Sequence, residues 1–243
     1  MKKIGKWFYE DLPEVLSTND SVSDLLEKIW APCIVSAAVQ TKGRGRLGRT
    51  WTESAGNLFV SFAYEIEPQK VGHYVIISAL AVLNVVRAFL PNQKVQIKWP
   101  NDVLLEGKKV SGILFEKGPK DYWVMGIGIN VAATPKVENP LYEITSLADF
   151  KAKANRLEVL EKLVYEFDEL EKKYLQNGFC GLKSLWLDNA YNRGKNVVVR
   201  QNGKELKGIF EGIDDNGALI VKTEDELKTI LAGDVFFRKI TNE

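Results

Sequence analysis

The sequence predicts an α+β protein with two domains. The larger is expected to hold a mixed, mostly antiparallel sheet packed against helices, and the smaller to be a β-barrel of the SH3-like type. Apolar runs that suit buried strands alternate with amphipathic helical segments through most of the chain. After residue 189 this pattern gives way to short strand candidates joined by tight turns. The domains are therefore placed at 1–189 and 190–243.

Within the large domain, periodicity assigns the elements one by one. Apolar residues at helical spacing predict helices, and continuous or alternating apolar runs predict strands. The expected helices are 21–30, 75–90 and 156–176, and the expected strands are 33–39, 57–66, 95–99, 103–105, 109–116 and 122–130. Because short turns join many of these strands, most neighbours should be antiparallel, with the helices on one face of the sheet.

The small domain is predicted from five short segments rich in β-branched residues. They are 195–200, 205–213, 218–222, 227–231 and 235–240. Asn-Gly and Gly-Asp pairs separate several of these segments, as tight turns require.

Composition and charge restrict the class of protein. Lys and Arg number 33 against 32 Asp and Glu, so the net charge of +1 offers no general attraction to nucleic acid or an anionic membrane. The N-terminus lacks a signal peptide, and no stretch is expected to reach the length of a membrane span. Cys33 and Cys180 are expected to be reduced thiols, and His73, the single histidine, a structural or surface residue. A cytoplasmic protein is predicted.

The clearest local signal is segment 42–51, Lys-Gly-Arg-Gly-Arg-Leu-Gly-Arg-Thr-Trp. Its glycines allow the backbone to approach a ligand, while Arg44, Arg46 and Arg49 supply donors for carboxylate or phosphate. A solvated basic loop or a nucleic-acid contact has the same composition. The segment alone therefore favours an anionic ligand without identifying it.

Two further segments carry candidate site residues. Lys98 and Lys109 flank a predicted hairpin whose bend carries Asn101 and Asp102, so both ammonium groups could face one cleft. Ordinary turn and core roles would explain the same residues. A Gly-Ile-Gly-Ile run before Asn130 would permit close packing against a ligand, although Gly-x-Gly is a weak signal by itself.

Taken together and in order, these motifs resemble those of the biotin protein ligase family. They are Ser17-Thr18-Asn19, Gln40, the Gly-Arg-Gly-Arg-x-Gly-Arg loop, Lys-Trp-Pro-Asn-Asp, Lys-x-x-Gly-Ile-Leu and Gly-Ile-Asn. The resemblance runs from about Ser17 to the end of the chain, and it implies the fold of class II aminoacyl-tRNA synthetase catalytic cores for the large domain. Leu47 departs from the polar or basic residue of many members. The segment before Ser17 is too short for the DNA-binding domain of some members, which predicts the short class.

The resemblance also implies roles for individual residues. Biotin would be bound by Ser17, Thr18, Asn19, Gln40, Arg44, Gly45, Arg46 and Lys109. ATP or the adenylate would be bound by Trp51, Lys98, Asn101 and Asn130. Lys109 and Arg46 would be the catalytic residues. No side chain is expected to ligate a metal, because Mg²⁺ would be held by the phosphates. Asp102 matches the motif but receives no role.

The reaction implied joins biotin and ATP into biotinyl-5′-AMP and then transfers biotin to a lysine of a biotin carboxyl carrier protein or domain. Neither nucleic acid nor membrane is expected as a partner, and a homodimer is left open. A lipoate ligase-like enzyme is the alternative, against which the complete Gly/Arg loop and Lys-Trp-Pro-Asn-Asp argue. The loop 41–50 is expected to be mobile until an anion arrives, because its arginines should repel one another.

Overall fold

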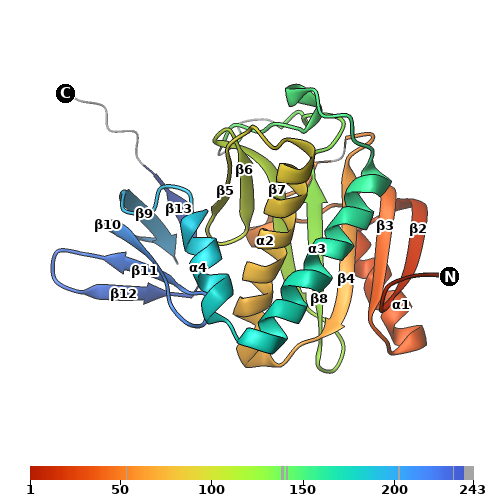
Figure 1. Ribbon diagram of the computed structural model, residues 1–243, viewed down its shortest axis with the longest axis horizontal. Coiled ribbons are helices and arrows are strands. Elements are labelled where there is room, and N and C mark those ends of the chain that lie inside the picture. Colours follow the sequence, from red (N-terminus) through yellow and green to blue (C-terminus); the bar gives the residue numbers. More distant parts are fainter. Residues whose placement is uncertain (53, 138–139, 141, 202, 232, 238–243) are drawn as a thin grey trace.

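The computed structural model describes the chain except residues 53, 138–139, 141, 202, 232 and 238–243. Within the described part, eight strands form one large sheet and five form a second (Figure 1). In spatial order the large sheet contains β1 (Lys2–Ile4), β2 (Trp7–Val15), β3 (Cys33–Gln40), β4 (Leu58–Glu65), β8 (Tyr122–Ile129), β7 (Lys108–Lys117), β6 (Asp102–Leu105) and β5 (Val95–Lys98).

The large sheet is mixed and mostly antiparallel, as predicted. β2 and β3 run parallel, and the other neighbouring pairs of described strands run antiparallel. A parallel pair needs a crossover, which helix α1 (Thr18–Ile29) provides between β2 and β3. β1 and β2 have no counterpart among the predicted elements, since Pro13 and the acidic residues of β2 obscure its alternation of buried and exposed side chains.

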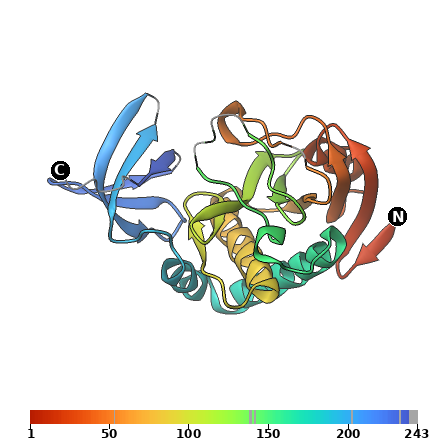
Figure 2. The same cartoon turned by 90° about the horizontal axis from the view of Figure 1, so that it is seen from above.

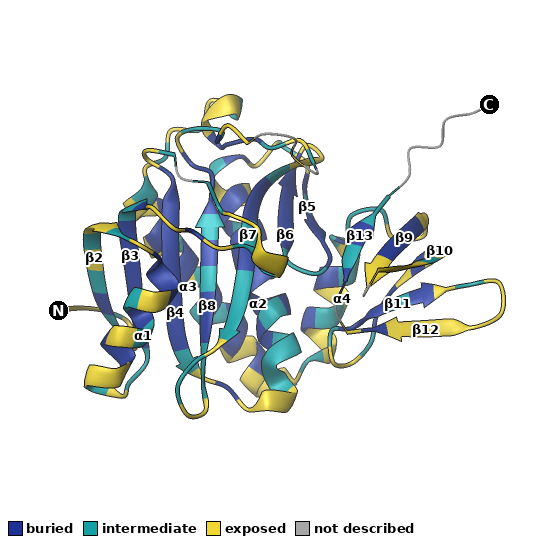
Figure 3. Ribbon diagram, turned by 180° about the vertical axis from the view of Figure 1, so that it is seen from behind, coloured by how far each residue is buried: buried dark blue, intermediate teal, exposed yellow. Residues whose placement is uncertain are grey.

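Helices cover both faces of the large sheet, so the expectation that they share one face is wrong. α2 (Val71–Phe89) and α3 (Arg156–Asn177) pack on one face, and α1 packs on the other (Figures 2 and 3). Successive strand side chains point to opposite faces. Accordingly, Phe62 joins the core under α2 and α3, whereas the next residue, Ala63, packs with α1.

Helix α2 is long and strongly apolar. With the 3-10 turn η2 (Pro68–Lys70) before it, it extends over Pro68–Phe89 and is long and apolar enough to cross a membrane, contrary to the prediction that no stretch reaches this length. In this fold 61% of the apolar window is buried, because α2 packs against both the sheet and α3. Its hydrophobicity is therefore explained by a place in the core.

The second sheet confirms the prediction of a small antiparallel β-domain. Its spatial order is β12 (Leu227–Ile230), β11 (Leu219–Lys222), β10 (Lys204–Ile213), β9 (Asn196–Gln201) and β13 (Asp234–Phe236). Helix α4 (Cys180–Asp188), which was not predicted, precedes it and places Trp186 edge-on to Phe210. The predicted boundary after residue 189 falls between α4 and β9. Because Trp186 contacts Phe210, the buried apolar core is continuous from the large sheet to the small one.

Replacing Phe62 by Ala should destabilise the protein strongly. Phe62 is fully buried, lies edge-on to Trp7 at 5.2 Å and stacks on Phe167 at 5.6 Å between ring centroids. Phe62→Ala should lower the free energy of unfolding by about 3–5 kcal/mol, because it leaves a cavity in the core. Urea denaturation followed by circular dichroism measures this. Leu175→Ala is the control, since Leu175 is 68% exposed. Equal effects of the two substitutions would contradict this description of the core.

Candidate functional site

A cavity of about 510 Å³ lies on the α1 face of the large sheet. α1 covers only part of this face, and the cavity occupies the part beyond the N-terminus of the helix. Eleven of the twelve residues predicted to bind ligands line it: Ser17, Thr18, Asn19, Gln40, Arg44, Gly45, Arg46, Trp51, Lys98, Asn101 and Lys109. Apolar residues such as Phe59 and Leu114 complete its wall.

Asn130 is the predicted site residue that does not line the cavity. It is 1% exposed, and its side-chain amide donates to the Thr145 carbonyl at 2.9 Å. Its backbone N–H donates to Val110, and its carbonyl accepts from Leu147. Asn130 thus joins the end of β8 to segment 145–147, a structural role for which ordinary hydrogen bonding suffices.

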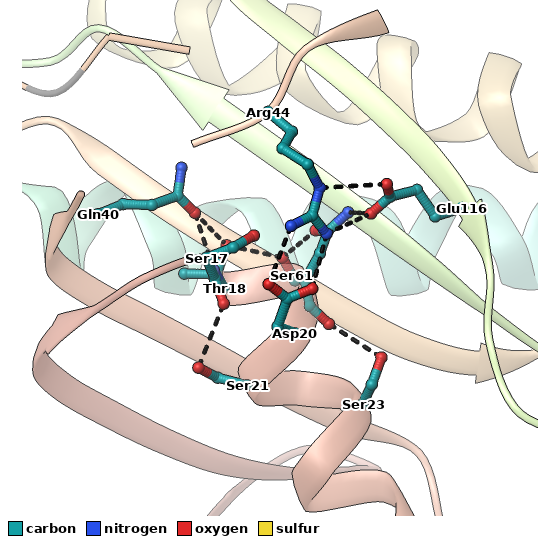
Figure 4. Close-up of polar contacts among 10 residues, drawn as sticks. Ser17, Thr18, Asp20, Ser21, Ser23, Gln40, Arg44, Ser61 and Glu116 are labelled. Carbon is teal, nitrogen blue, oxygen red and sulfur yellow. Dashed lines mark hydrogen bonds and ion pairs between the residues drawn. The ribbon is translucent and has the colours of Figure 1, made fainter. Parts of the chain in front are cut away.

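One end of the cavity is formed by buried polar groups bonded to one another (Figure 4). The Gln40 side-chain oxygen accepts from the backbone N–H and the hydroxyl of Thr18, at 2.8 and 3.0 Å. The Ser61 hydroxyl lies 2.8 Å from the Thr18 hydroxyl and 2.5 Å from Asn19 Oδ1. Ser17 precedes α1 in the N-cap position, yet its side chain makes no capping bond. Buried polar groups held in this way can match the donors and acceptors of a polar ligand.

Arg44 is held by two carboxylates at the same end (Figure 4). Its guanidinium donates to both oxygens of Asp20, at 2.9 and 2.7 Å, and to Glu116 Oε2 at 3.1 Å. Glu116 Oε2 also accepts from the Asn19 amide at 2.5 Å. These bonds raise the pKa of Arg44, and the Arg44 hydrogen bond lowers the pKa of Asp20. Arg44 therefore fixes the wall of the cavity, and its charge is already compensated.

The other loop arginines differ in their partners. Arg49 forms an ion pair with Asp234 of β13, which brings the second sheet to the cavity. Arg46 donates to Asn101 Oδ1 at 3.3 Å, and no carboxylate among the described residues pairs with it. Burial lowers the pKa of Arg46. Two of the three arginines are thus held by carboxylates, which the expectation of mutual repulsion did not include. Arg49 does repel Arg46, whose charge is attracted by Asp234 and Asp102 without forming an ion pair with either.

Lys109 and Asp102 form an ion pair at the centre of the site. Lys109 Nζ lies 2.7 Å from Asp102 Oδ1, and the Asp102 residue is 7% exposed. Beside it, the Asn101 amide donates to the Ile113 carbonyl at 2.7 Å, which fixes the bend between β5 and β6. The hairpin thus brings Lys98 and Lys109 to one cavity, as predicted.

Lys98 is a buried cation whose nearest described partner is an aromatic ring. The residue is 5% exposed, and Nζ lies 3.7 Å from the centroid of the Tyr142 ring. Burial lowers the pKa of Lys98 to about 8, against the opposing attraction of Asp102. A phosphate entering the cavity would favour the charged form, because it would place a further negative charge near the ammonium.

Two glycines facing each other in the sheet explain the position of Trp51. Gly112 of β7 and Gly128 of β8 are register partners, and a methyl group at either would overlap the Trp51 indole. Gly126, two residues earlier in β8, likewise leaves room for the Asn19 side chain, which a methyl group at this position would overlap. The glycines were predicted to allow close packing of a ligand. In the structure they admit protein side chains that form the cavity.

The structure also adds residues that the sequence motifs did not single out: Asp20, Ser61, Glu116, Tyr142 and Asp234. Ser61 could have been noticed as a polar residue within the apolar run Leu58-Phe59-Val60-Ser61-Phe62. Asp20, Glu116, Tyr142 and Asp234 follow no motif. Their roles depend on long-range contacts that bring different segments together.

Comparison with known proteins identifies the family. Residues 13–130 match the model of the biotin/lipoate A/B protein ligase family, and residues 194–238 match that of the biotin protein ligase C-terminal domain. A biotin–[acetyl-CoA-carboxylase] ligase of Paracoccus denitrificans is 34% identical over 234 residues, which cover 91% of this chain and 97% of the relative. The chain belongs to the biotin protein ligase family.

Other members of the biotin protein ligase family agree over similar lengths. The bifunctional ligase/repressor BirA of Bacillus subtilis is 33% identical, over 91% of this chain and 72% of its own. A structure of the biotin protein ligase from Aquifex aeolicus in complex with biotin and ATP has 30% sequence identity and a TM-score of 0.79, and the match covers 95% of this chain and 98% of that chain. The match spans both sheets, which confirms the predicted fold class for this biotin protein ligase.

The pKa of Lys98 predicts how the stability of this biotin protein ligase depends on pH. The folded protein loses the Lys98 proton near pH 8, whereas the unfolded chain holds it to about the ordinary value of 10.5. Between these limits the unfolded state binds more protons, so the free energy of unfolding should rise with pH relative to a Lys98→Met variant. Urea denaturation of both proteins across this range measures the difference. Parallel stability curves would show that Lys98 is not desolvated.

Proposed function

We propose that this chain is a biotin–[acetyl-CoA-carboxylase] ligase, which uses ATP to form biotinyl-5′-AMP and transfers biotin to a lysine of a biotin carboxyl carrier protein or domain. One observation carries the proposal. A single cavity unites a buried polar end around Thr18 and Gln40 with a cationic end around Lys98, and Lys109 and Arg46 also line it. The ligand-bound Aquifex aeolicus relative supports the assignment of biotin and ATP.

The two ends suit the two substrates. The ureido ring of biotin would lie against Ser17, Thr18 and Gln40, because a buried polar ring needs matched hydrogen bonds. Asn19, whose amide is already bonded to Ser61 and Glu116, would shape this end of the cavity. Arg44 and Gly45 would close over the valeryl chain beside the apolar wall. The adenylate would bind near Trp51, Lys98 and Asn101, and Asn130 would support that side from beneath.

The first chemical step joins two anions, so positive charge is the main requirement. A carboxylate oxygen of biotin attacks the α-phosphorus of ATP, the bond from that phosphorus to the bridging oxygen of the β-phosphate breaks, and pyrophosphate leaves. Lys109 and Arg46 hold the carboxylate against the α-phosphate and stabilise the charge that develops there. Asp102 keeps the Lys109 ammonium in place through their 2.7 Å ion pair. Mg²⁺ bound by the phosphates would neutralise further charge.

The second step needs no covalent enzyme intermediate. The free amine of the acceptor lysine attacks the acyl carbon of the mixed anhydride, AMP leaves, and an amide bond forms. The cavity delays loss of the anhydride to water, since the loop arginines and the sheet enclose it. The acceptor would be a biotin carboxyl carrier domain, and the reaction would take place in the cytoplasm.

Pyrophosphate exchange tests the proposal directly. The family model matched by residues 13–130 includes lipoate as well as biotin ligases. With radiolabelled pyrophosphate and ATP, exchange should depend on biotin and should not respond to lipoate. Exchange that requires lipoate instead would replace the proposal with the lipoate ligase alternative.

Replacing Lys109 by Ala should slow adenylation. Loss of a positioned cation should lower biotin-dependent pyrophosphate exchange by about 10²-fold or more. The neighbouring Lys108→Ala is the matched control, because Lys108 is exposed and pairs with Glu143 rather than with a cavity residue. Near-normal exchange in a folded Lys109→Ala variant would refute the catalytic role.

Replacing Arg46 by Gly should release the adenylate. Arg46 lines the cavity and forms no ion pair with a described carboxylate, so its loss should weaken biotin binding and let biotinyl-5′-AMP escape to bystander lysines. A streptavidin blot after incubation with serum albumin detects this labelling. Leu47→Gly serves as control, because Leu47 is 71% exposed and its φ of 56° suits glycine. Limited proteolysis of the loop, with and without biotin, is the second measurement. If labelling stays confined to the carrier domain and biotin does not change the rate of cleavage in the loop, the loop is a static anion site.

A further inference from the structure

Two aromatic side chains of the large domain donate hydrogen bonds to main-chain carbonyls of the second sheet. Trp99 Nε1 donates to the Gly217 carbonyl at 3.1 Å, and the Tyr142 hydroxyl donates to the Val235 carbonyl at 3.0 Å. Both donors adjoin Lys98: Trp99 follows it in the chain, and the Tyr142 ring covers its ammonium at 3.7 Å. The Tyr142 ring covers the buried cation directly, whereas Trp99, which lies in the apolar core, acts on Lys98 through the adjoining backbone at the end of β5.

The first contact involves a turn that is seated firmly on the large domain. The turn at Gly217 joins β10 to β11 and approaches α2 so closely that a methyl group at Gly72 would overlap the Asn216 carbonyl. His73 Nε2 lies 2.7 Å from the Asp215 carbonyl oxygen, and its ring stacks on Phe179 at 4.0 Å. The Gly217 carbonyl is thus held in place from several sides, which makes it a fixed acceptor for Trp99.

The second contact holds an aromatic ring against the Lys98 ammonium. Asp102 and Asp234 both line the cavity and both attract the Lys98 ammonium. The Tyr142 ring lies against this ammonium, with its centroid 6.2 Å from that of Phe236. Burial raises the pKa of Tyr142, so its hydroxyl keeps the proton that it donates to Val235. A ring held in this way restricts the positions that Lys98 can take.

We propose that Trp99 and Tyr142 are positioning residues for Lys98, and that the second sheet holds both of them through main-chain carbonyls so that the Lys98 ammonium is placed for the nucleotide phosphates. This inference rests on the proposed function, in which Lys98 binds the ATP side. It assigns the second sheet a specific task. The sheet shapes the nucleotide end of the cavity by holding Trp99 and Tyr142 through main-chain carbonyls, in addition to the charge that Asp234 of β13 supplies there.

The test uses substitutions that remove the two donors: Tyr142→Phe removes only the hydroxyl, and Trp99→Phe removes the indole N–H together with part of a buried ring. Trp99→Phe and Tyr142→Phe are made in the full chain, each alone and in a Lys98→Ala background. Calorimetric titration measures the binding of a non-hydrolysable ATP analogue and, separately, of biotin. Tyr122→Phe is the matched control, because the Tyr122 hydroxyl also donates to a main-chain carbonyl, that of Trp30 at 3.2 Å, away from the cavity.

Each donor variant should bind the ATP analogue roughly fivefold more weakly, the effect of one net hydrogen bond. Its biotin affinity should stay within about twofold of the unmodified chain, and in the Lys98→Ala background neither substitution should weaken nucleotide binding further. Equal loss of biotin and nucleotide affinity would overturn the proposal. It would also be overturned if either substitution weakened nucleotide binding as much in the Lys98→Ala background as in the unmodified chain. If Trp99→Phe fails to fold, Tyr142→Phe decides alone. An unmodified chain that binds neither biotin nor nucleotide would instead contradict the proposed function.

Discussion

The close approach of the Trp51 and Asn19 side chains to the backbone of β7 and β8 determines where the site residues lie. Gly112, Gly126 and Gly128 present no side chain on the cavity face of β7 and β8, so Trp51 and Asn19 lie directly against the sheet. Because the two positions in β8 are one pleat repeat apart, the polar end and the aromatic end of the cavity are separated by about 7 Å along that strand. A methyl group at any of these glycines would overlap a side chain that forms the cavity.

The distribution of charge separates structural cations from those available to a ligand. Arg44 and Arg49 are compensated by carboxylates, so they hold the Gly/Arg loop against α1 and the second sheet. Arg46 is half-buried and Lys98 is buried, and neither forms an ion pair with a carboxylate among the described residues, so their partial desolvation raises the free energy of the site. Anionic substrates relieve this penalty on binding. The same loop can therefore be well anchored at its ends and still attract a carboxylate or phosphate.

The sequence was informative where short-range patterns decide the structure and weaker where distant segments meet. Apolar periodicity predicted β3, β4 and α3 closely. Eleven of the twelve ligand-binding residues predicted from the ordered motifs line one cavity. β2 was missed because its alternation is interrupted by acidic residues and Pro13. Ser61, Glu116 and Tyr142 were missed because each acts on a partner that is distant in the chain. The compensation of Arg44 by Asp20 likewise depends on the folded arrangement of α1 and the loop.

The seating of the β10–β11 turn on α2 has a consequence for how this region can vary. Its contacts to Trp99 and His73 are made by carbonyl oxygens, which every amino acid possesses. Most side chains of the turn could therefore be exchanged without loss of the contact, whereas inserting or deleting a residue would move the acceptors. Gly217 is one exception, since its φ of 82° and its proximity to Gly72 leave little room for another residue. Asp214 is another, because its Oδ1 accepts from the backbone N–H groups of Asn216 and Ala218 at 2.9 and 2.8 Å. The constraint on this joint thus falls on the length of the turn rather than on its composition.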